Sequence, residues 1–563
     1  MEEKSFSLST EHRAPMITAM AGETFDLVII GGGITGAGIA RDAASRGMRV
    51  ALVEARDFAF GTSSRSSKLI HGGIRYLENM EFGLVFEALS ERRLLFEMAP
   101  HLVHPLRFVL PLYKGGRVGM FKMGLGMWLY DALSMFEAPE LHERLSPDES
   151  LERLPQLKRR DLLGSYVYSD AYMDDDRLVI ETLRSAVHLG ALCANYVSAD
   201  SAHLVDGKVR AIGCTDKITG KSFSIRGKHF ISTVGPWTDV VAPKLVGEWK
   251  KILRPSKGVH LTFDRKRLPL SQAVVMAADK EKRIVFGIPR HEMIIIGTTD
   301  TDYKGDPAEV GTTPEDVSYL LKVAGEYFPG AKLTADDIVS TYAGVRPLVD
   351  DGSATESKTS REHTIMVDPR NVTFVAGGKY TTYRRMAEDS VKEALGTFSL
   401  EDQVRFSRSD TKRALNAKAT PEKMESSLMA AEEWAAAFKL SPNVVEEMIG
   451  RHGAEAYDIL DDVCRGREAP GDTMDAKLWA MEARFAVRET MCMSLIDFYV
   501  RRTPLFLARA DHGMAHIGLL SHVFAGNLGW SDSKRQEQAQ ALRNYIEHEL
   551  AWRSHFRINV SSA

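Results

Sequence analysis

The sequence predicts an α/β protein: a Rossmann-like domain that binds a dinucleotide, an antiparallel-sheet domain inserted into it, and a C-terminal all-helical domain. Three observations support this fold class. A strand, a glycine turn, a helix and a second strand follow one another over residues 25–54. Alternating apolar and polar residues, typical of antiparallel strands, recur over 252–305, and helical periodicity fills 420–555. At roughly 150 residues per domain, a chain of 563 residues should hold two to four domains.

The strand–turn–helix unit is the most informative stretch. Its first strand, Leu27–Ile30, is an apolar run typical of a parallel strand buried on both faces. Gly31 allows a sharp turn, and Gly33 removes a side chain where a pyrophosphate must approach. Gly36 permits close packing of the helix on the strand. The helix N-terminus then offers free N–H groups to the pyrophosphate.

An acidic residue, Glu54, directly follows the second strand. Its distance from the turn is close to the offset of roughly 20 residues expected of an acid that accepts hydrogen bonds from ribose hydroxyls. A glycine turn alone is weak evidence, because such turns are common. Here the whole βαβ context is present, so the sequence predicts dinucleotide binding.

Residues 61–77 follow, rich in serine and glycine. Four positively chargeable side chains, Arg65, Lys68, His71 and Arg75, fall within this segment. A solvated loop would explain the hydroxyls and glycines equally well. We favour a binding role, because hydroxyls and backbone N–H groups bind pyrophosphate and an arginine fork binds a phosphate monoester.

Residues 114–136 combine basic and apolar residues. Lys114, Arg117 and Lys122 precede an apolar run that carries Trp128 and Tyr130. This pattern suits a helix lying at a membrane interface. A helix buried against its own domain explains it equally well, and both interpretations stay open.

Two later segments repeat the strand-then-glycine pattern. Phe230–Trp237 ends a buried strand in a glycine turn before a helix, and Val372–Arg384 does the same. Both are further places where backbone can meet a cofactor. The acidic cluster Asp174–Asp176 begins a helix, where the helix dipole favours acids. We therefore predict no metal site there.

Composition excludes several classes of protein. The formal net charge of −4 argues against a general nucleic-acid binder. Four scattered cysteines show neither metal-ligand spacing nor a disulfide framework, as expected of reduced thiols in a cytosolic protein. Residues 1–24 are polar, so a flexible leader is expected rather than a secretory signal. The sequence contains no run of about 18 consecutive apolar residues without charge, so a membrane-spanning helix is not expected.

Six segments occur in one order and carry a specific resemblance. They are the 31–36 fingerprint, 61–77, Ser256–His260, Ile296–Asp300, Tyr342–Pro347 and Gly377–Arg384. Together they resemble the FAD-dependent glycerol-3-phosphate dehydrogenases of the respiratory type, over roughly residues 24–395. The helical part resembles that family's C-terminal domain, less diagnostically. Tyr380 stands where a leucine is expected.

The resemblance implies oxidation of sn-glycerol 3-phosphate to dihydroxyacetone phosphate, a step of glycerol metabolism, with electrons passing from FAD to a membrane quinone. It implies a peripheral protein on the cytoplasmic face of the inner or plasma membrane, in contact with lipid, or a cytoplasmic one. It leaves a homodimer open. An oxidase that hands electrons to O2 and makes H2O2, and a catalytically silent flavoprotein scaffold at the membrane, are the alternatives.

The resemblance and the chemistry together assign the site. His260 is the expected general base, since a near-neutral pKa suits a proton acceptor. Arg346 is expected to stabilise the developing alkoxide, and the opposite division of the two roles stays open. The substrate-binding residues are Arg75, Tyr76, Lys379 and Thr381. Lys379 opposes the dipole at a helix start, which suggests a bound anion. The cofactor-binding residues are Gly31, Gly33, Ile34, Thr35, Gly36, Glu54, Ala55, Thr62, Ser63, Ser66, Ser67, Lys68, Leu69, His71, Gly73, Val197, Gly235, Trp237, Gly378, Lys379 and Tyr380.

The domains expected from these assignments are discontinuous. Residues 25–95, 175–250 and 335–400 should form the FAD-binding Rossmann-like domain. Residues 96–174 and 251–334 should form the inserted antiparallel-sheet substrate or cap domain, and 401–563 the helical domain.

Overall fold

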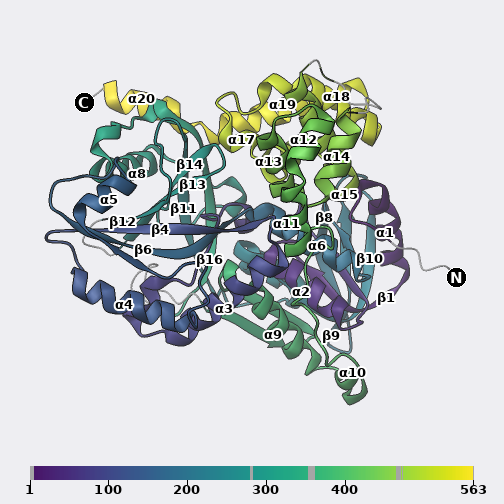
Figure 1. The fold of residues 1–563 in the computed structure, drawn as a ribbon. Helices are drawn as coiled ribbons and strands as arrows, with labels where there is room; N and C mark the ends of the chain where they lie inside the picture. Colours follow the sequence, from purple (N-terminus) through teal and green to yellow (C-terminus); the bar gives the residue numbers. More distant parts are fainter. Residues whose placement is uncertain (1–5, 279–282, 353–361, 465–470, 472, 562–563) are drawn as a thin grey trace.

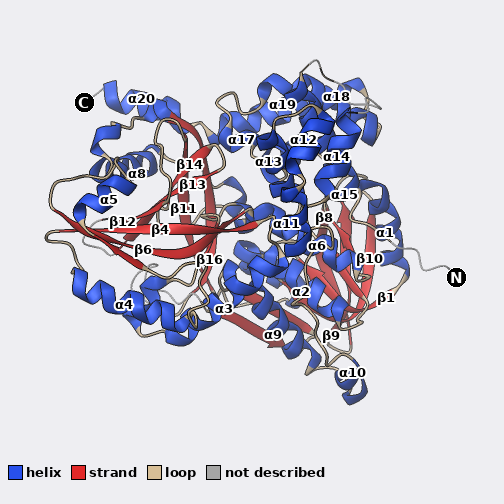
Figure 2. Cartoon of the chain, in the orientation of Figure 1, coloured by secondary structure: helices blue, strands red, loops and turns tan. Residues whose placement is uncertain are grey.

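The computed structural model describes residues 6–278, 283–352, 362–464, 471 and 473–561. Two twisted sheets stand side by side, and helices from the C-terminal part of the chain lie above the first (Figure 1). Helices cover the outside of both sheets (Figure 2). The predicted α/β class, with a second sheet and a helical C-terminal part, is confirmed.

The first sheet is mainly parallel. β1 pairs in parallel with β2 on one side and with β10 on the other, and β10 pairs in parallel with β18. Ile29 of β1 is fully buried, as expected of a covered parallel strand. The spatial order is β17 (His363–Asp368), β18 (Val372–Gly377), β10 (Ser222–Ser232), β1 (Thr24–Ile30), β2 (Val50–Val53) and β7 (Leu192–Ala194), with β8 (Val197–Val205) and β9 (Lys208–Asp216) attached through β10.

The glycine turn after β1 has the geometry that the sequence predicts. Gly31 has a φ of 111°, which favours glycine. A Cβ on Gly36 would lie 1.9 Å from the Gly31 carbonyl oxygen, so only glycine lets the helix approach the strand this closely. The helix α2 (Ile34–Ser45) then packs against α6 (Asp175–His188) and α9 (Tyr383–Leu395).

The second sheet is mainly antiparallel. Its spatial order is β15 (Thr301–Asp302), β11 (Leu253–Asp264), β14 (Met293–Gly297), β13 (Arg283–Arg290), β12 (Ala273–Ala278), β4 (Val103–Tyr113), β6 (Leu162–Met173) and β3 (Leu69–Ile70), with β16 (Ile338–Val349) paired to β11 and β5 (Glu143–Leu145) to β6. The β11–β16 register places His260 opposite Tyr342.

This sheet corrects part of the predicted domain division. β16 lies within 335–400, which was assigned to the first domain, yet it pairs with β11 of the second sheet. β3, from the segment 61–77, likewise pairs with β6. Sequence patterns show that a segment is a strand, but only its hydrogen-bond partners decide which sheet it joins. Both segments therefore connect the two sheets.

The remaining helices complete the architecture. Those before residue 410 are α1 (Thr10–Gly22), α3 (Phe82–Met98), α4 (Met120–Leu133), α5 (Pro147–Arg153), α7 (Thr238–Val246), α8 (Pro314–Tyr327) and α10 (Leu400–Arg405). The C-terminal helices are α11 (Pro421–Met429), α12 (Ala431–Phe438), α13 (Pro442–His452), α14 (Glu455–Cys464), α15 (Met474–Glu489), α16 (Leu495–Arg501), α17 (Leu505–Ala508), α18 (Ile517–Leu528), α19 (Asp532–Glu549) and α20 (Trp552–Ser561). None of the helices that the structure describes is long and apolar enough to cross a bilayer.

The expectation of a flexible leader over residues 1–24 is wrong for the part that the structure describes. Ser9 caps α1 by accepting a hydrogen bond from the His12 N–H. Met16 and Met20 are fully buried against the first domain. Arg13 pairs with Asp216 at 2.6 Å. Met16 and Met20 are spaced one helical turn apart, and two apolar residues among polar neighbours are only a weak sequence signal for a packed helix.

Candidate active site

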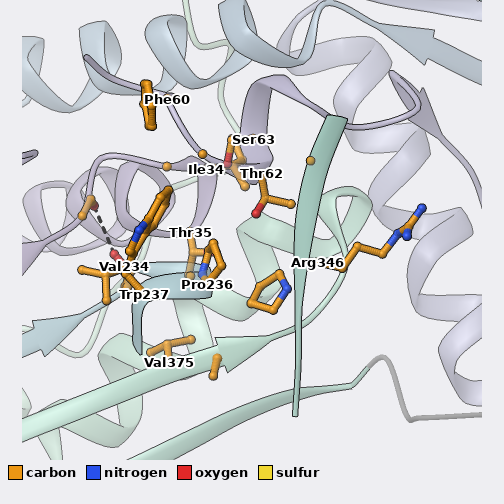
Figure 3. Close-up of a pocket in the computed structure, with 18 of the residues that line it drawn as sticks. Ile34, Thr35, Phe60, Thr62, Ser63, Val234, Pro236, Trp237, Arg346 and Val375 are labelled. Carbon is orange, nitrogen blue, oxygen red and sulfur yellow. Dashed lines mark hydrogen bonds between the residues drawn. The ribbon is translucent and has the colours of Figure 1, made fainter. Parts of the chain in front are cut away.

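A cavity of about 550 Å³ opens where the two sheets meet. It lies at the carboxyl ends of β1, β10 and β18, the edge at which parallel sheets bind ligands. β11 and β16 of the second sheet supply the facing wall. In Figure 3, Phe60 and Trp237 stand at one end of the lining residues and Arg346 at the other.

Most of the predicted site residues line this cavity, although they come from segments far apart in the chain. They are Gly31, Gly33, Ile34, Thr35, Glu54, Ala55, Thr62, Ser63, Ser66, Ser67, Leu69, His71, Tyr76, Val197, Gly235, Trp237, His260, Arg346, Gly378, Lys379, Tyr380 and Thr381. The structure therefore brings the nucleotide fingerprint and the predicted catalytic residues to one place.

The wall formed by the start of α2 suits a dinucleotide phosphate. The Ile34 N–H at this helix N-terminus donates to Ser63 Oγ at 3.0 Å. A Cβ on Gly33 would lie 3.1 Å from the same hydroxyl, so a side chain there would fill the space between the helix and the 61–64 turn. Two further turns at this edge, at Gly235 and Gly378, also have positive φ, 55° and 90°. These residues fit the predicted pyrophosphate site.

Glu54, the expected ribose acceptor, is held in the cavity wall by two backbone donors. Its carboxylate accepts hydrogen bonds from the Gly32 N–H at 2.7 Å and the Arg56 N–H at 2.8 Å. Burial raises the pKa of Glu54, and these two backbone donors partly offset that effect. Each carboxylate oxygen retains a lone pair for a hydroxyl donor.

Four predicted residues, Gly36, Gly73, Lys68 and Arg75, do not stand among the lining residues. Gly36 and Gly73 act through backbone shape, and Gly73 has a φ of 74°. Lys68 turns away from the cavity, because its ammonium group pairs with the buried carboxylate of Asp175. The side chain of Arg75 lies outside the described part of the structure. The expected role of the Lys68 side chain at the cofactor is thus not supported.

His260 is buried, with only 1% of its surface exposed. Its Nε2 lies 2.8 Å from Ser67 Oγ, and its ring stacks on that of Tyr342 with a centroid separation of 4.6 Å. Burial, together with the positive charges of Arg346 and Lys68, holds the pKa of His260 well below its usual range. The imidazole is therefore neutral near pH 7, but its lowered pKa differs from the near-neutral value expected from the sequence and makes it a weaker base.

Arg346 is oriented by the turn after β14. It donates to Asp300 Oδ1 at 3.2 Å and to Thr298 Oγ1 at 2.9 Å. The guanidinium lies against Gly258, where a Cβ would come within 2.4 Å of Nη2. Sequence reasoning noted this turn but missed the role of Asp300 as the partner of Arg346. No local pattern pairs a residue on one strand with a residue in a turn 46 positions away.

Lys379 lies over the ring of Tyr76, with Nζ 4.0 Å from the ring centroid. Close by, the His71 N–H donates to Thr381 Oγ1 at 3.2 Å. The Tyr380 hydroxyl donates to the Asp175 carbonyl oxygen, so this tyrosine is fixed in the wall. A cationic group thus stands on the same side of the cavity as two residues predicted to bind substrate.

Several lining residues were not predicted. They come from the 55–61 loop, the turn between β9 and β10, and α7, and include Arg56, Phe60, Lys217, Val240 and Lys244. These segments carry no phosphate-binding or catalytic pattern. They line the cavity only because the fold places them there.

Two family models match the chain. The model described as FAD dependent oxidoreductase matches residues 26–384. The model described as C-terminal domain of alpha-glycerophosphate oxidase matches residues 422–535. The first match includes strands of both sheets and all of the cavity lining except Met386, and the second lies within the helical domain.

Named relatives agree with these models. An aerobic glycerol-3-phosphate dehydrogenase of Staphylococcus aureus (strain MRSA252) is 34% identical over 545 residues, which cover 96% of this chain and 98% of that protein. A solved glycerol-3-phosphate dehydrogenase from Bacillus halodurans, complexed with FAD, is 29% identical with a TM-score of 0.77 and covers 96% of this chain and 98% of that one. An L-alpha-glycerophosphate oxidase from Mycoplasma pneumoniae shares the fold, at 18% identity, a TM-score of 0.52, and coverage of 66% of this chain and 94% of that one. FAD is the cofactor that the nucleotide site holds, and the chain belongs to the family of FAD-dependent glycerol-3-phosphate dehydrogenases.

Proposed function

We propose that the protein oxidises sn-glycerol 3-phosphate to dihydroxyacetone phosphate and passes the electrons to a membrane quinone. The observation that carries this proposal is the convergence of His260, Arg346 and Lys379 in the cavity that also contains the dinucleotide fingerprint. A proton acceptor, an electrophilic cation and an anion-binding ammonium are the groups needed to oxidise a phosphorylated alcohol. A relative that aligns with 96% of this chain is named an aerobic glycerol-3-phosphate dehydrogenase, which supports the proposal.

The bound FAD supplies the hydride acceptor. His260 accepts the hydroxyl proton at Nε2, the ring nitrogen that contacts Ser67. Its Nδ1 is buried and has no hydrogen-bond partner among the described residues. Stacking on Tyr342 keeps the ring in one orientation.

Arg346 stabilises the negative charge that develops on the substrate oxygen. Its guanidinium is already fixed by Asp300 and Thr298, so little reorganisation is needed as the charge develops. Lys379, together with Arg75, binds the substrate phosphate and thereby anchors the end that does not react. The opposite division, in which Arg346 takes the hydroxyl proton and His260 stabilises the developing charge, predicts a much smaller effect of His260 substitution.

The quinone acceptor implies contact with a membrane, and α4 is the segment proposed to make it. Phe121 is 82% exposed and Trp128 61% exposed. Leu125, Leu129 and Met135 are also exposed, while Lys122 on the same helix supplies a positive charge. An apolar helix face with aromatic residues and flanking basic residues suits an interfacial helix on anionic lipid.

The direct test is anaerobic flavin reduction. Purified protein should be yellow, and its flavin absorbance should bleach on addition of sn-glycerol 3-phosphate but not of an amino acid. A water-soluble quinone should then restore the colour faster than oxygen does. Rapid reoxidation by oxygen with release of H2O2 would support an oxidase instead. Absence of bleaching by any polyol phosphate would support a catalytically silent flavoprotein.

A further inference from the structure

Residues 57–65 form a loop that lies directly on the nucleotide fingerprint. The Ala59 N–H donates to the Gly32 carbonyl at 3.0 Å, and Ser63 Oγ accepts the Ile34 N–H at 3.0 Å. Phe60, Gly61, Thr62 and Ser63 all line the cavity. The conformation of this loop therefore decides whether the phosphate and ribose contacts of FAD are in place.

The first end of the loop is held by the helical domain. The Asp57 carboxylate accepts hydrogen bonds from Arg501 Nε at 2.7 Å and from Arg502 Nη1 at 2.9 Å. The three side chains are at most 4% exposed. Burial raises the pKa of Asp57, but the guanidinium groups of Arg502 and Arg501 more than offset it and leave that pKa below the ordinary value. The carboxylate is therefore charged and paired.

The second end of the loop is held by the same domain. Arg65 donates to Glu549 Oε1 at 3.0 Å and to the Ala343 carbonyl of β16 at 2.8 Å. Glu549, the last residue of α19, is 1% exposed. Gly344 has no Cβ to obstruct this contact, since a Cβ there would lie 2.7 Å from the Arg65 Cβ. The loop is thus pressed between β16 and the helical domain.

We propose that Glu549, Arg501 and Arg502 of the helical domain are positioning residues of the FAD site, which fix both ends of the 57–65 loop and so determine how tightly FAD is retained. Removing one member of a buried ion pair leaves the other charge buried and uncompensated, which strongly destabilises the local structure. The loop then populates conformations that do not bind FAD. The apparent dissociation constant rises by the reciprocal of the competent fraction. This inference concerns cofactor retention and holds whichever substrate or electron acceptor the protein uses.

The test compares Glu549→Gln with a matched interdomain ion pair away from the loop. Arg184 of α6 pairs with Glu455 of α14 at 2.9 Å, with side chains 15% and 13% exposed. FAD dissociation constants are measured on the full-length chain by flavin fluorescence during reconstitution, together with the thermal midpoints of the apoproteins. We expect Glu549→Gln to bind FAD about tenfold more weakly. Glu455→Gln should lower the midpoint comparably and change FAD affinity by less than about twofold. Wild-type affinity in Glu549→Gln, or equal weakening in both variants, would overturn the proposal.

Because Arg65 itself lines the cavity, a double-mutant cycle separates indirect from direct effects. If Glu549 acts through Arg65, the Arg65→Gln/Glu549→Gln double variant binds FAD as weakly as the worse single variant, within about twofold. If the FAD affinity of the double variant is instead reduced by the product of the two single-variant reductions, the two residues act independently and the proposal is contradicted. Should Glu549→Gln fail to fold, Arg65→Lys is the second variant, because it keeps the positive charge but removes the guanidinium that donates to Glu549 and to the Ala343 carbonyl. An unchanged FAD affinity in Arg65→Lys would then refute the positioning role.

Discussion

His260 is the single residue on which the proposed chemistry depends most directly. It is buried beside two cations, yet its Nε2 contacts a hydroxyl at the cavity wall. These surroundings favour the neutral imidazole, which is the form that a general base requires.

We expect His260→Asn to lower the limiting rate of flavin reduction by a factor of about 10² to 10⁴, the usual contribution of a general base. Asparagine keeps a polar group near Ser67 but cannot accept the proton. FAD content should stay at the wild-type level. Stopped-flow measurement of the anaerobic reductive half-reaction gives the rate and the substrate dissociation constant separately. A change in the dissociation constant alone would remove His260 from the proton-transfer step.

Arg346 tests the neighbouring role. Lysine keeps the positive charge at this position but loses the planar fork that bonds Asp300 and Thr298 together. We expect Arg346→Lys to lower the limiting rate of flavin reduction by about 10² or more. The same stopped-flow experiment checks this. A normal rate with a raised substrate dissociation constant would place Arg346 in phosphate binding instead.

Other buried histidines make stability depend on pH. Burial lowers the pKa of His229 to about 4, and that of His452 likewise to about 4. The unfolded chain protonates histidine below about pH 6.5, so between these values it binds more protons than the folded chain. Stability is therefore lost as the pH falls through this window. We expect His229→Gln to flatten the decline of the thermal midpoint between pH 7 and 5, whereas substitution of the exposed His522 should not. If the thermal midpoints of His229→Gln and of the wild type fall equally between pH 7 and 5, this expectation is contradicted.

At the scale of the element, α4 is unusual because its apolar face is open to solvent in the chain that the structure describes. Folding within the chain does not explain a face on which Phe121 and Trp128 remain mostly exposed. Burial of such side chains in lipid gives each a favourable transfer free energy of about 1.5–3 kcal/mol. The open face therefore favours the interfacial interpretation of residues 114–136 over the buried one.

We expect Phe121→Glu/Trp128→Glu to reduce binding to vesicles containing anionic lipid by at least about tenfold in a flotation assay. Reduction of a soluble dye by glycerol 3-phosphate should be unchanged, because α4 supplies no residue to the cavity lining. Leu400→Glu is the control, since Leu400 is 80% exposed on the separate helix α10. Equal binding by both variants would exclude α4 as the lipid contact.

At the scale of the whole molecule, the cavity is built by two sheets and braced by the helical domain. Because FAD binds the folded protein and not the unfolded chain, it stabilises by about 2.7 kcal/mol at a free concentration of 100 times its dissociation constant. We expect removal of FAD to lower the thermal midpoint and re-addition to restore it in a concentration-dependent way. Differential scanning fluorimetry on the apoprotein with increasing FAD provides the measurement. A thermal midpoint that does not change with FAD concentration would show that the cavity does not bind FAD.

Much of this molecule was predictable from local pattern. The turn at Gly31 and the close packing at Gly36 follow from backbone geometry, which a few neighbouring residues decide. The strand-then-glycine pattern also located the turns at Gly235 and Gly378. The presence of His260, Arg346 and Lys379 in one site rested on the family resemblance, since nothing local connects residues so far apart.

The sequence by itself determined the dinucleotide-binding fold, because short-range sterics and periodicity encode strands, turns and helices. The choice of FAD and the residues of the site came from the family resemblance. Only the tertiary structure decided which cations face the cavity. Lys68 comes from the same short segment as Ser66 and Ser67, yet it pairs with the buried carboxylate of Asp175 and does not line the cavity, whereas Arg65 lines the cavity while it pairs with Glu549. A buried charge requires a partner, and that partner can lie hundreds of residues away, where no local pattern reports it.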